Sequence, residues 1–509
     1  MASIDIQRPP AYPTFNFDPS VAPPTSKWVP PRWMVEHDSA PQTPKYANVN
    51  GLGEPWDPRR PVFKGVDLTK PDPRIRVPSV EMKAANGSDD SVVAFVDVNI
   101  IDSTGKEPYH GDVLVKGKRI ISVGDKLSPE TLKGARVFQG KGRTLMSGLC
   151  DAHSHMSFNN SETMDGLTNL DIEEHTLFTA RSAHIFLDCG YTMCLGAASV
   201  KQRLDMVVRD AINQGQIPGP RYLANGQEMA PPDGALIPGI TKFVNDADDI
   251  VKAVKVMAGE GVDAVKFSMS GDEILDDLRA EDTTFPDDMV AAGSEAAHAC
   301  GIRVCSHARS DESVVQCLQY GVDIIYHASF VSDSTMLALE AQKDRVYVAP
   351  TLNFPYATVH EAQAKGFPVT NSQQTAYTRE LDIAIATMRE MKKRGIKIMP
   401  GGDYGFAWTP HGTYRDLEHF VKLLGYTPME AILSATALGG EIMLHPNELG
   451  KVQPGYYADL LLVNGNPLED ISLLSKRENL DVIMINGKVH KETIGDHPLQ
   501  YELEKSLAK

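Results

Sequence analysis

Short apolar segments alternate with helix-like segments over residues 148–440, and this alternation restricts the possible fold more than any other feature of the chain. The apolar segments read YTMCLGAASV, GVDAVKFSM, GIRVCSHA, GVDIIYHA, RVYVAPTL and GIKIMPGGD. Strands that alternate with helices in this way form βα units around a parallel sheet. The length of the region suits a (β/α)8 TIM barrel, although a doubly wound sheet produces the same pattern.

Ionisable side chains stand where these predicted strands end. They are His153 and His155 in DAHSHM, Lys266 in DAVK, His307 in RVCSH, His327 in IIYH and Asp403 in MPGGD. The active sites of barrel enzymes are built at the carboxyl ends of the strands, and residues two apart on an extended chain project from one face. Imidazole and carboxylate groups are the usual ligands of catalytic zinc.

Each of these residues alone has an ordinary explanation. A single strand histidine is more often a hydrogen-bonded core residue than a ligand. Lys266 could be a surface lysine, and Asp403 beside two glycines could close a turn. A buried lysine is harder to explain, because burial disfavours the ammonium form. Taken together, histidines, a lysine and an aspartate at successive strand ends indicate a metal-dependent hydrolase.

Two other kinds of sequence flank this region. Residues 91–147 and 441–495 contain short β-rich runs, such as GDVLVKGKRIISVGD and NLDVIMINGKVHKE, which predict one small β-sandwich built from both ends of the chain. Residues 1–90 are rich in proline, which disfavours helices and central strands. This arm is either a disordered leader or a segment that lies along the folded body or a neighbouring subunit. Its aromatic residues Phe15, Phe17, Trp28, Trp33 and Trp56 favour the second interpretation.

The composition excludes several classes of protein. A net charge of −17 argues against general binding to nucleic acids or anionic membranes. There is no apolar run long enough to span a bilayer, and the first residues have no secretory apolar core. The six cysteines are scattered without CxxC spacing, which is typical of reduced thiols. We therefore expect a cytoplasmic protein.

The motifs together resemble the amidohydrolase superfamily over residues 93–490. The resemblance is carried by TLMSGLCDAHSHM, AVKFSMSG, RVCSHA, IIYHAS, GGDYG and the late stretch LSATALGGEIMLHPNELGKVQPGYYADLLLVNGNPLED. GPRYLANG, KFSMSGDE and SATALGG are most similar to a subgroup that contains ochratoxinase, prolidase-like enzymes, and phenylurea and molinate hydrolases. The arm 1–90 has no counterpart in this pattern.

The resemblance implies a distorted (β/α)8 barrel with a β-sandwich and a binuclear metal centre. His153, His155 and Asp403 would hold the more buried metal, His307 and His327 would hold the second, and Lys266, carboxylated by CO2, would bridge them. The metals would be zinc by default, although Mn, Co and Fe suit the same ligands. They would share a bridging hydroxide as the nucleophile. Asp403 would take the proton of the attacking water and deliver it to the leaving amine.

The subgroup implies an amide-type substrate, such as an aryl amide, an N-acyl amino acid or a peptide, with an aromatic or bulky partner. Arg309 either binds a substrate carboxylate or pairs with a nearby acid of the protein. Asn353, Tyr356 and His411 follow later strand ends, where loops determine specificity, although each could be a plain loop residue. Tyr356 and Trp408 could supply an apolar wall.

Three alternatives remain open. One is a hydrolase of ureas or carbamates, and the second is a mononuclear deaminase of a cyclic amidine, in which Lys266 would not bridge metals. The third is a non-catalytic scaffold, which the complete ligand set argues against. The resemblance also implies a homo-oligomer, because members of the superfamily commonly form dimers to octamers and the aromatic arm could grip a neighbour.

Overall fold

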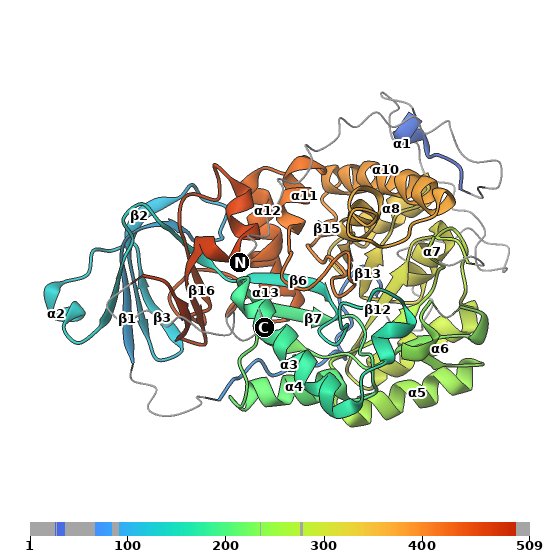
Figure 1. The fold of residues 1–509 in the computed structure, drawn as a ribbon, viewed down its shortest axis with the longest axis horizontal. Helices are drawn as coiled ribbons and strands as arrows, with labels where there is room; N and C mark the ends of the chain where they lie inside the picture. Colours follow the sequence, from blue (N-terminus) through green and yellow to red (C-terminus); the bar gives the residue numbers. More distant parts are fainter. Residues whose placement is uncertain are drawn as a thin grey trace.

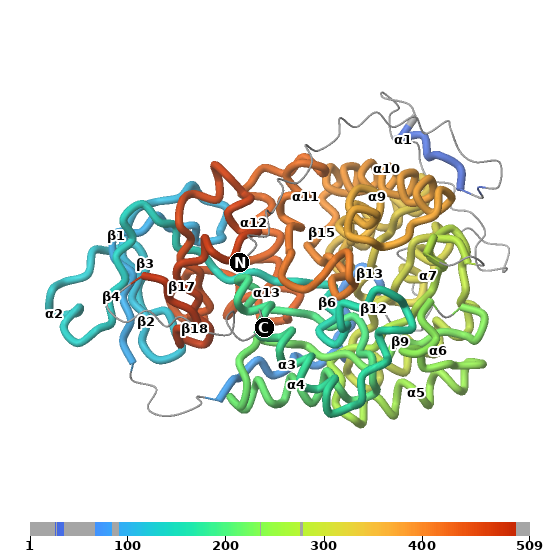
Figure 2. The backbone as a smooth tube through the Cα atoms, viewed as in Figure 1, coloured from blue at the N-terminus to red at the C-terminus, as the bar shows by residue number. Residues whose placement is uncertain are grey.

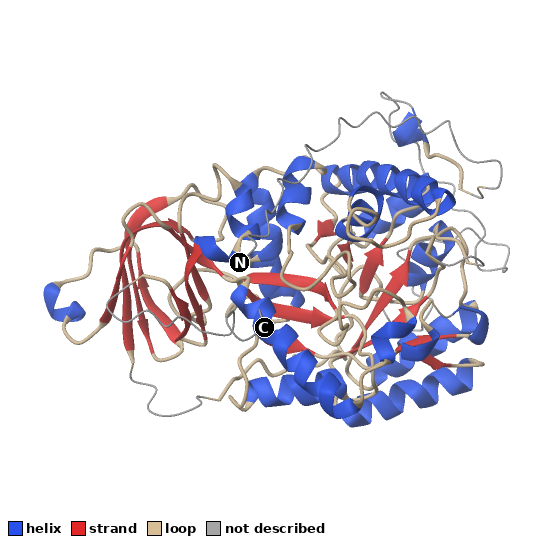
Figure 3. Ribbon diagram, in the orientation of Figure 1, coloured by secondary structure: helices blue, strands red, loops and turns tan. Residues whose placement is uncertain are grey.

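A computed structural model describes residues 26, 28–35, 67–83, 91–234, 236–274 and 278–494. The small β domain and the larger α/β domain lie side by side along the longest axis of the molecule (Figure 1). The larger domain carries its helices on the outside and its strands inside (Figure 3). Among the described residues, no helix is both long enough and apolar enough to cross a membrane, and the six cysteines are free.

The larger domain is an α/β domain of barrel-like design. Its parallel strands are β6 (Leu149–Ser154), β7 (Tyr191–Gly196), β8 (Arg221–Leu223), β9 (Glu228–Ala230), β10 (Thr241–Phe243), β11 (Ala264–Ser268), β12 (Arg303–Ala308), β13 (Ile324–His327), β14 (Tyr347–Ala349) and β15 (Lys397–Ile398). They pair in the orders β6-β7-β8 and β10-β9-β11-β12-β13-β14-β15.

Helices follow these strands and bury their apolar faces against them in one large core. They are α3 (Ile172–Asp188), α4 (Leu204–Asn213), α5 (Ala247–Glu260), α6 (Asp287–Ala299), α7 (Asp311–Gln319), α8 (Asp333–Ala341), α9 (Asn353–His360), α10 (Asn371–Lys393), α11 (Asp416–Lys422), α12 (Pro428–Ala435) and α13 (Ala437–Ile442). Hydroxyl caps start several of them: in α10 and α12, Thr370 and Thr427 form capping boxes with Gln373 and Glu430.

The predicted barrel is confirmed as a barrel-like α/β domain, but its strand ladders do not close. The ladder is interrupted between β8 and β11 and between β15 and β6. The first seam is crossed by an isolated parallel bridge between Asn225 and Ala264, where Asp263 N donates to Ala224 O at 2.8 Å. At the second seam, Ala152 N donates to Pro400 O at 2.9 Å. Pro400, two residues after the end of β15, has no N–H with which to continue the ladder.

The small domain is one hydrogen-bonded sheet, so the predicted β-sandwich is not confirmed. Its order is β18-β17-β16-β5-β1-β2-β3, with β4 beside β1. The bounds are β1 (Val92–Ile101), β2 (Tyr109–Lys116), β3 (Arg119–Val123), β4 (Arg136–Gln139), β5 (Thr144–Ser147), β16 (Leu460–Val463), β17 (Leu480–Ile485) and β18 (Lys488–Glu492), with the short helix α2 (Pro129–Leu132) before β4. Strands from both ends of the chain lie next to each other in Figure 2 and share one apolar core.

The described parts of the N-terminal arm pack against the larger domain. Trp28 is buried against Phe330 just before α1 (Arg32–Val35), and the backbone N of Trp28 donates to Glu281 Oε2 at 2.8 Å. Residues 67–83 run beside the barrel, where Leu68 is buried and its carbonyl accepts from Arg345 Nε at 3.1 Å. Phe15, Phe17 and Trp56 lie outside the described residues.

His298 on α6 joins residues 67–83 to the barrel. Its Nε2 lies 3.0 Å from Asp323 Oδ2, and its Nδ1 lies 3.4 Å from Asp72 Oδ2. Burial alone would lower the pKa of His298, but the two carboxylates outweigh it and raise the pKa. The folded chain therefore holds this proton more tightly than the unfolded chain does.

We expect the free energy of unfolding to fall as the pH rises through the raised pKa of His298. The stabilisation is complete below the ordinary pKa of 6.5 and is lost above the raised value. Urea titrations at successive pH values would measure this slope, and His298→Gln should remove that part of it. An unchanged slope in the variant would show that His298 does not carry the linkage.

Candidate active site

The strand ends bring the sequence-predicted residues together. His153 lies on β6 and His155 just after it, Lys266 lies on β11, and His307 and His327 end β12 and β13. Asp403 follows β15. One cavity is lined by all of these residues except His327, and by a set of apolar ones. Its lining residues are His153, His155, Phe158, Met164, Glu228, Leu236, Ile237, Lys266, Asp272, Ile274, His307, Phe354, Asp403 and Phe406.

The distances between these groups are short enough for a shared cation. His155 Nε2 is 3.1 Å from Asp403 Oδ1, and His153 Nε2 is 4.0 Å from the same oxygen. Ligand atoms of His153, His327 and Asp403 all lie within 4.8 Å of one another. The rings of His307 and His327 have centroids 4.4 Å apart. His327 therefore links the group around Asp403 to His307, and the candidate ligands form one continuous cluster.

The other ring nitrogens are held by the protein. His153 Nδ1 pairs with Thr351 Oγ1 at 2.8 Å, His155 Nδ1 with Ala198 O at 3.2 Å, and His307 Nε2 with Gly271 O at 3.1 Å. Contacts of this kind fix the ring orientation and leave the opposite nitrogen for a metal. Among the described residues, neither ring nitrogen of buried His327 has a hydrogen-bond partner.

The electrostatics of the cluster favour neutral imidazoles. Burial, reinforced by nearby cationic groups that include Lys266 and Arg309, holds the pKa values of His153, His307 and His327 well below the ordinary value. A neutral imidazole offers a lone pair to a metal. Lys266 is 2% exposed, and its Nζ lies 4.6 Å from the centroid of the Tyr326 ring. The imidazole nitrogens and the Asp403 carboxylate are donors that fit divalent cations.

The backbone is strained at several positions around this cluster. His327, Ala328, Thr351 and Asp403 have φ angles of 73°, 50°, 58° and 56°, a region that non-glycine residues rarely adopt. Strain of this kind persists where the surrounding structure holds a side chain in place. Gly401 is needed for a different reason: a Cβ there would lie 2.7 Å from His153 Cβ.

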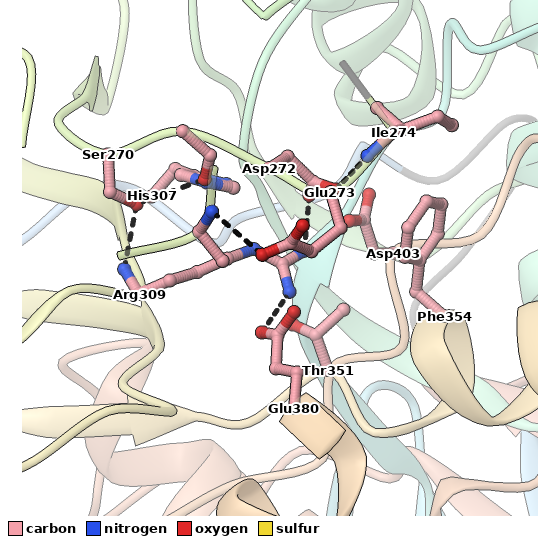
Figure 4. A network of polar contacts seen from close by, with 12 residues as sticks. Ser270, Asp272, Glu273, Ile274, His307, Arg309, Thr351, Phe354, Glu380 and Asp403 are labelled. Atoms are coloured by element: carbon pink, nitrogen blue, oxygen red, sulfur yellow. Dashed lines mark hydrogen bonds and ion pairs between the residues drawn. The ribbon is translucent and has the colours of Figure 1, made fainter. Parts of the chain in front are cut away.

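Arg309 belongs to a buried ion-pair network beside the cavity (Figure 4). Its guanidinium pairs with Asp272 at 2.6 Å and also with Glu380. Its backbone N donates to Ser270 Oγ at 2.9 Å. Arg309 is not among the cavity-lining residues, whereas Asp272 is. Of the two roles that the sequence left open, the observed contacts therefore support the structural one.

We expect Arg309→Met to unfold at a markedly lower urea concentration, because it leaves Asp272 and Glu380 buried without their cation. Breaking a buried pair on one side typically costs about 3–5 kcal/mol. The double variant Arg309→Met/Glu380→Gln should recover part of this loss. A stable Arg309→Met protein with a raised KM only for carboxylate-bearing substrates would instead support substrate binding.

The other predicted substrate residues lie behind the cavity wall. Asn353 accepts a hydrogen bond from Arg415 Nε at 2.8 Å, and Tyr356 packs on His419. His411 Nε2 lies 3.0 Å from Phe158 O, and burial lowers the pKa of His411 to about 4. None of the three lines the cavity.

The apolar wall comes mainly from residues that the sequence did not single out. They are Phe158, Met164, Leu236, Ile237, Ile274, Phe354 and Phe406. Trp408, which the sequence suggested for this wall, does not line the cavity and packs against Phe354 and Phe406. Glu228 on β9 is also a lining residue, and burial raises its pKa. Apart from Phe354 on α9, these residues lie on loops and a short strand, where no periodicity marks them. The SFNN stretch directly after DAHSHM was the one available signal.

Comparison with known proteins identifies the family. The model of the Amidohydrolase family matches residues 144–490. Ochratoxinase from Aspergillus niger is 24% identical over 443 residues, which cover 79% of this chain and 88% of the relative. A prolidase complexed with N-methylphosphonate-L-proline has a TM-score of 0.70 at 21% identity, with 79% and 100% of the two chains covered. A Xaa-Pro dipeptidase with bound methionine has a TM-score of 0.69 at 23% identity and the same coverage.

These matches confirm the resemblance found in the strand-end motifs. The family match spans β5 to β18 and includes the whole cluster of histidines, lysine and aspartate. The solved structures share the fold over most of this chain. The chain belongs to the amidohydrolase family and is a hydrolase that acts on carbon–nitrogen bonds.

Proposed function

We propose that this enzyme hydrolyses the amide bond of a small molecule that carries an aromatic or bulky apolar group, and that it uses two divalent cations. The observation that carries the proposal is buried His327, whose two ring nitrogens have no hydrogen-bond partner among the described residues, within 4.8 Å of ligand atoms of His153 and Asp403, beside a cavity with an apolar wall. An ordinary core would satisfy such a group. A metal site gives the His327 ring a partner.

The residues divide naturally into two ligand sets. His153, His155 and Asp403 would hold one cation, and His307 and His327 would hold the other. Lys266 would bridge them after its Nζ first gives up a proton to become a neutral amine, then adds to CO2 and loses a second proton, which leaves a carbamate with two oxygens. Zinc is the default ion, and Mn, Co and Fe suit the same ligands. Cations bound there lower the pKa of water and polarise a carbonyl oxygen.

Asp403 is the group of this chain that would move the proton. Its carboxylate takes a proton from the attacking water as the new C–O bond forms, and it delivers that proton to the leaving nitrogen as the C–N bond breaks. His155, 3.1 Å away, keeps the carboxylate in place. The strained φ of Asp403 holds the same orientation.

The substrate class is supported by the apolar wall and by the relatives. Phe158, Phe354 and Phe406 give the cavity an aromatic lining, which suits an aryl or bulky acyl group. The relatives are named ochratoxinase, prolidase and Xaa-Pro dipeptidase. We therefore place aryl amides, N-acyl amino acids and dipeptides with a bulky residue first among the candidates. The protein would be cytoplasmic and would form a homo-oligomer. Sedimentation would test the oligomeric state.

A hydrolysis screen with metal analysis tests this proposal. Aryl amides, N-acyl amino acids, dipeptides, phenylureas and carbamates should be compared with cyclic amidines, using enzyme stripped of metal as the control. We expect metal-dependent release of amine from amides, and faster turnover when an aromatic group replaces a methyl group. Deamination of cyclic amidines by an enzyme inert toward amides would contradict the proposal.

A further inference from the structure

Two histidines and an aspartate meet where the larger domain contacts the small sheet. His184 and Asp188 lie on α3, and His490 lies on β18. His184 Nε2 is 3.3 Å from Asp188 Oδ2, and His490 Nε2 is 2.7 Å from Asp188 Oδ1. Ligand atoms of all three lie within 4.8 Å of one another, and none of the three lines the active-site cavity.

The position of Asp188 is unusual for a carboxylate. His184 and Asp188 are one turn apart on the same helix face, and Asp188 is the last residue of α3. Unpaired carbonyls make this end of a helix negative, which disfavours an anion and favours a cation. A cation held between Asp188 and the two imidazoles would reverse this unfavourable interaction.

The cluster is largely enclosed but open on one side. The imidazoles of His184 and His490 are 6% and 7% exposed, whereas the Asp188 side chain is 23% exposed. Burial alone would raise the pKa of Asp188, but hydrogen bonds to both histidines outweigh it and lower the pKa. The carboxylate is therefore ionised at neutral pH, and water can reach it.

We propose that His184, Asp188 and His490 form a second, structural metal site for Zn2+ or a similar divalent cation. In a tetrahedral zinc site with bonds near 2.0–2.1 Å, ligand atoms lie about 3.4 Å apart. The separation of 3.3 Å between His184 Nε2 and Asp188 Oδ2 matches this spacing, and His490 Nε2, which lies 2.7 Å from the other carboxylate oxygen, would move outward by less than about 1 Å to admit the ion. Two imidazoles, one carboxylate and a water complete four-coordination, and the donor types suit zinc, cobalt or nickel.

This site would fasten the small sheet to the larger domain. Asp188 and His490 are 302 residues apart in the sequence. In the described sheet, β18 is an edge strand that pairs only with β17. A metal that binds the folded chain alone shifts the equilibrium toward it. The role is structural, so it does not depend on the proposed catalytic chemistry.

Metal content and thermal unfolding of the full chain test the proposal together. The wild type loaded with Zn2+ should hold one more equivalent of metal per chain than His490→Gln, and excess Zn2+ should raise its Tm by a few degrees. In His490→Gln and His184→Gln that rise should be lost, while amide hydrolysis at saturating metal stays within about twofold of the wild type. With Co2+ in both proteins, the wild type should show additional visible absorption over His490→Gln, whose remaining band comes from the active site.

His445→Gln is a matched control, because His445 forms a histidine–carboxylate pair with Glu448 at 3.0 Å without a third ligand. This variant should keep the full metal content and the Zn2+-dependent rise in Tm. The proposal is overturned if the folded wild type and His490→Gln bind equal metal and respond equally to Zn2+. In that case the three side chains form a hydrogen-bonded ion triad only. Loss of hydrolysis in the wild type would instead count against the catalytic proposal.

Discussion

Asp403→Asn is expected to lose about 10²–10⁴-fold in kcat while it keeps its bound metal. An amide can still offer an oxygen to a cation, but it cannot take a proton from water or deliver one to a leaving nitrogen. The side chain is nearly isosteric, so the contact with His155 and the strained backbone at this position should remain. Steady-state hydrolysis and metal analysis on the same preparation measure both quantities.

The matched control is Asp382→Asn on α10, a partly buried carboxyl outside the cavity whose pKa burial raises to about 6. This variant should keep full activity. If Asp403→Asn retained both its metal and most of its kcat, another group would have to move the proton. A loss of metal together with activity would show only that Asp403 is a ligand.

Lys266→Met is expected to change stability in opposite directions with and without metal. In metal-free protein, Met removes a buried amino group whose described contact is the face of the Tyr326 ring, so unfolding should require the same or a higher denaturant concentration. In metal-loaded protein, the bridging group is lost, so metal affinity and kcat/KM should each fall by at least roughly 10²-fold. Denaturant titrations of both forms and metal-binding titrations provide the comparison.

The dependence of activity on CO2 distinguishes a carboxylated Lys266 from an unmodified one. Wild-type enzyme stripped of metal in CO2-free buffer should recover activity only when metal and bicarbonate are both supplied. Lys266→Met should not respond to bicarbonate. If Lys266→Met bound metal and turned over substrate like the wild type, Lys266 would be an ordinary buried side chain, and the two-metal proposal would fail.

The strand-end residues were predictable because they depend on local periodicity. His307 and His327 each end a short apolar run after a glycine-led turn, so the sequence placed them on one edge of the sheet. Parallel strands then bring residues far apart in sequence to the same edge. This rule brings the polar lining residues from His153 to Asp403 into one cavity.

Other features could not be read from the sequence, since they depend on long-range contacts. Nothing local distinguishes Arg309 as a partner of Glu380, 71 residues away. The seams between β8 and β11 and between β15 and β6 reflect strand lengths of two or three residues, which periodicity does not fix. The small domain was predicted as a sandwich, whereas its strands form one hydrogen-bonded sheet. Alternation of apolar and polar residues shows which side of each strand is buried, but it does not show which strands pair with one another.

Anomalous X-ray diffraction from crystals of the metal-loaded enzyme would test the central claim most directly. We predict two peaks in the active site, one beside His153, His155 and Asp403 and one beside His307 and His327, with carbamate density on Lys266 between them. A single peak with an unmodified Lys266 side chain would contradict the two-metal mechanism and favour the mononuclear alternative.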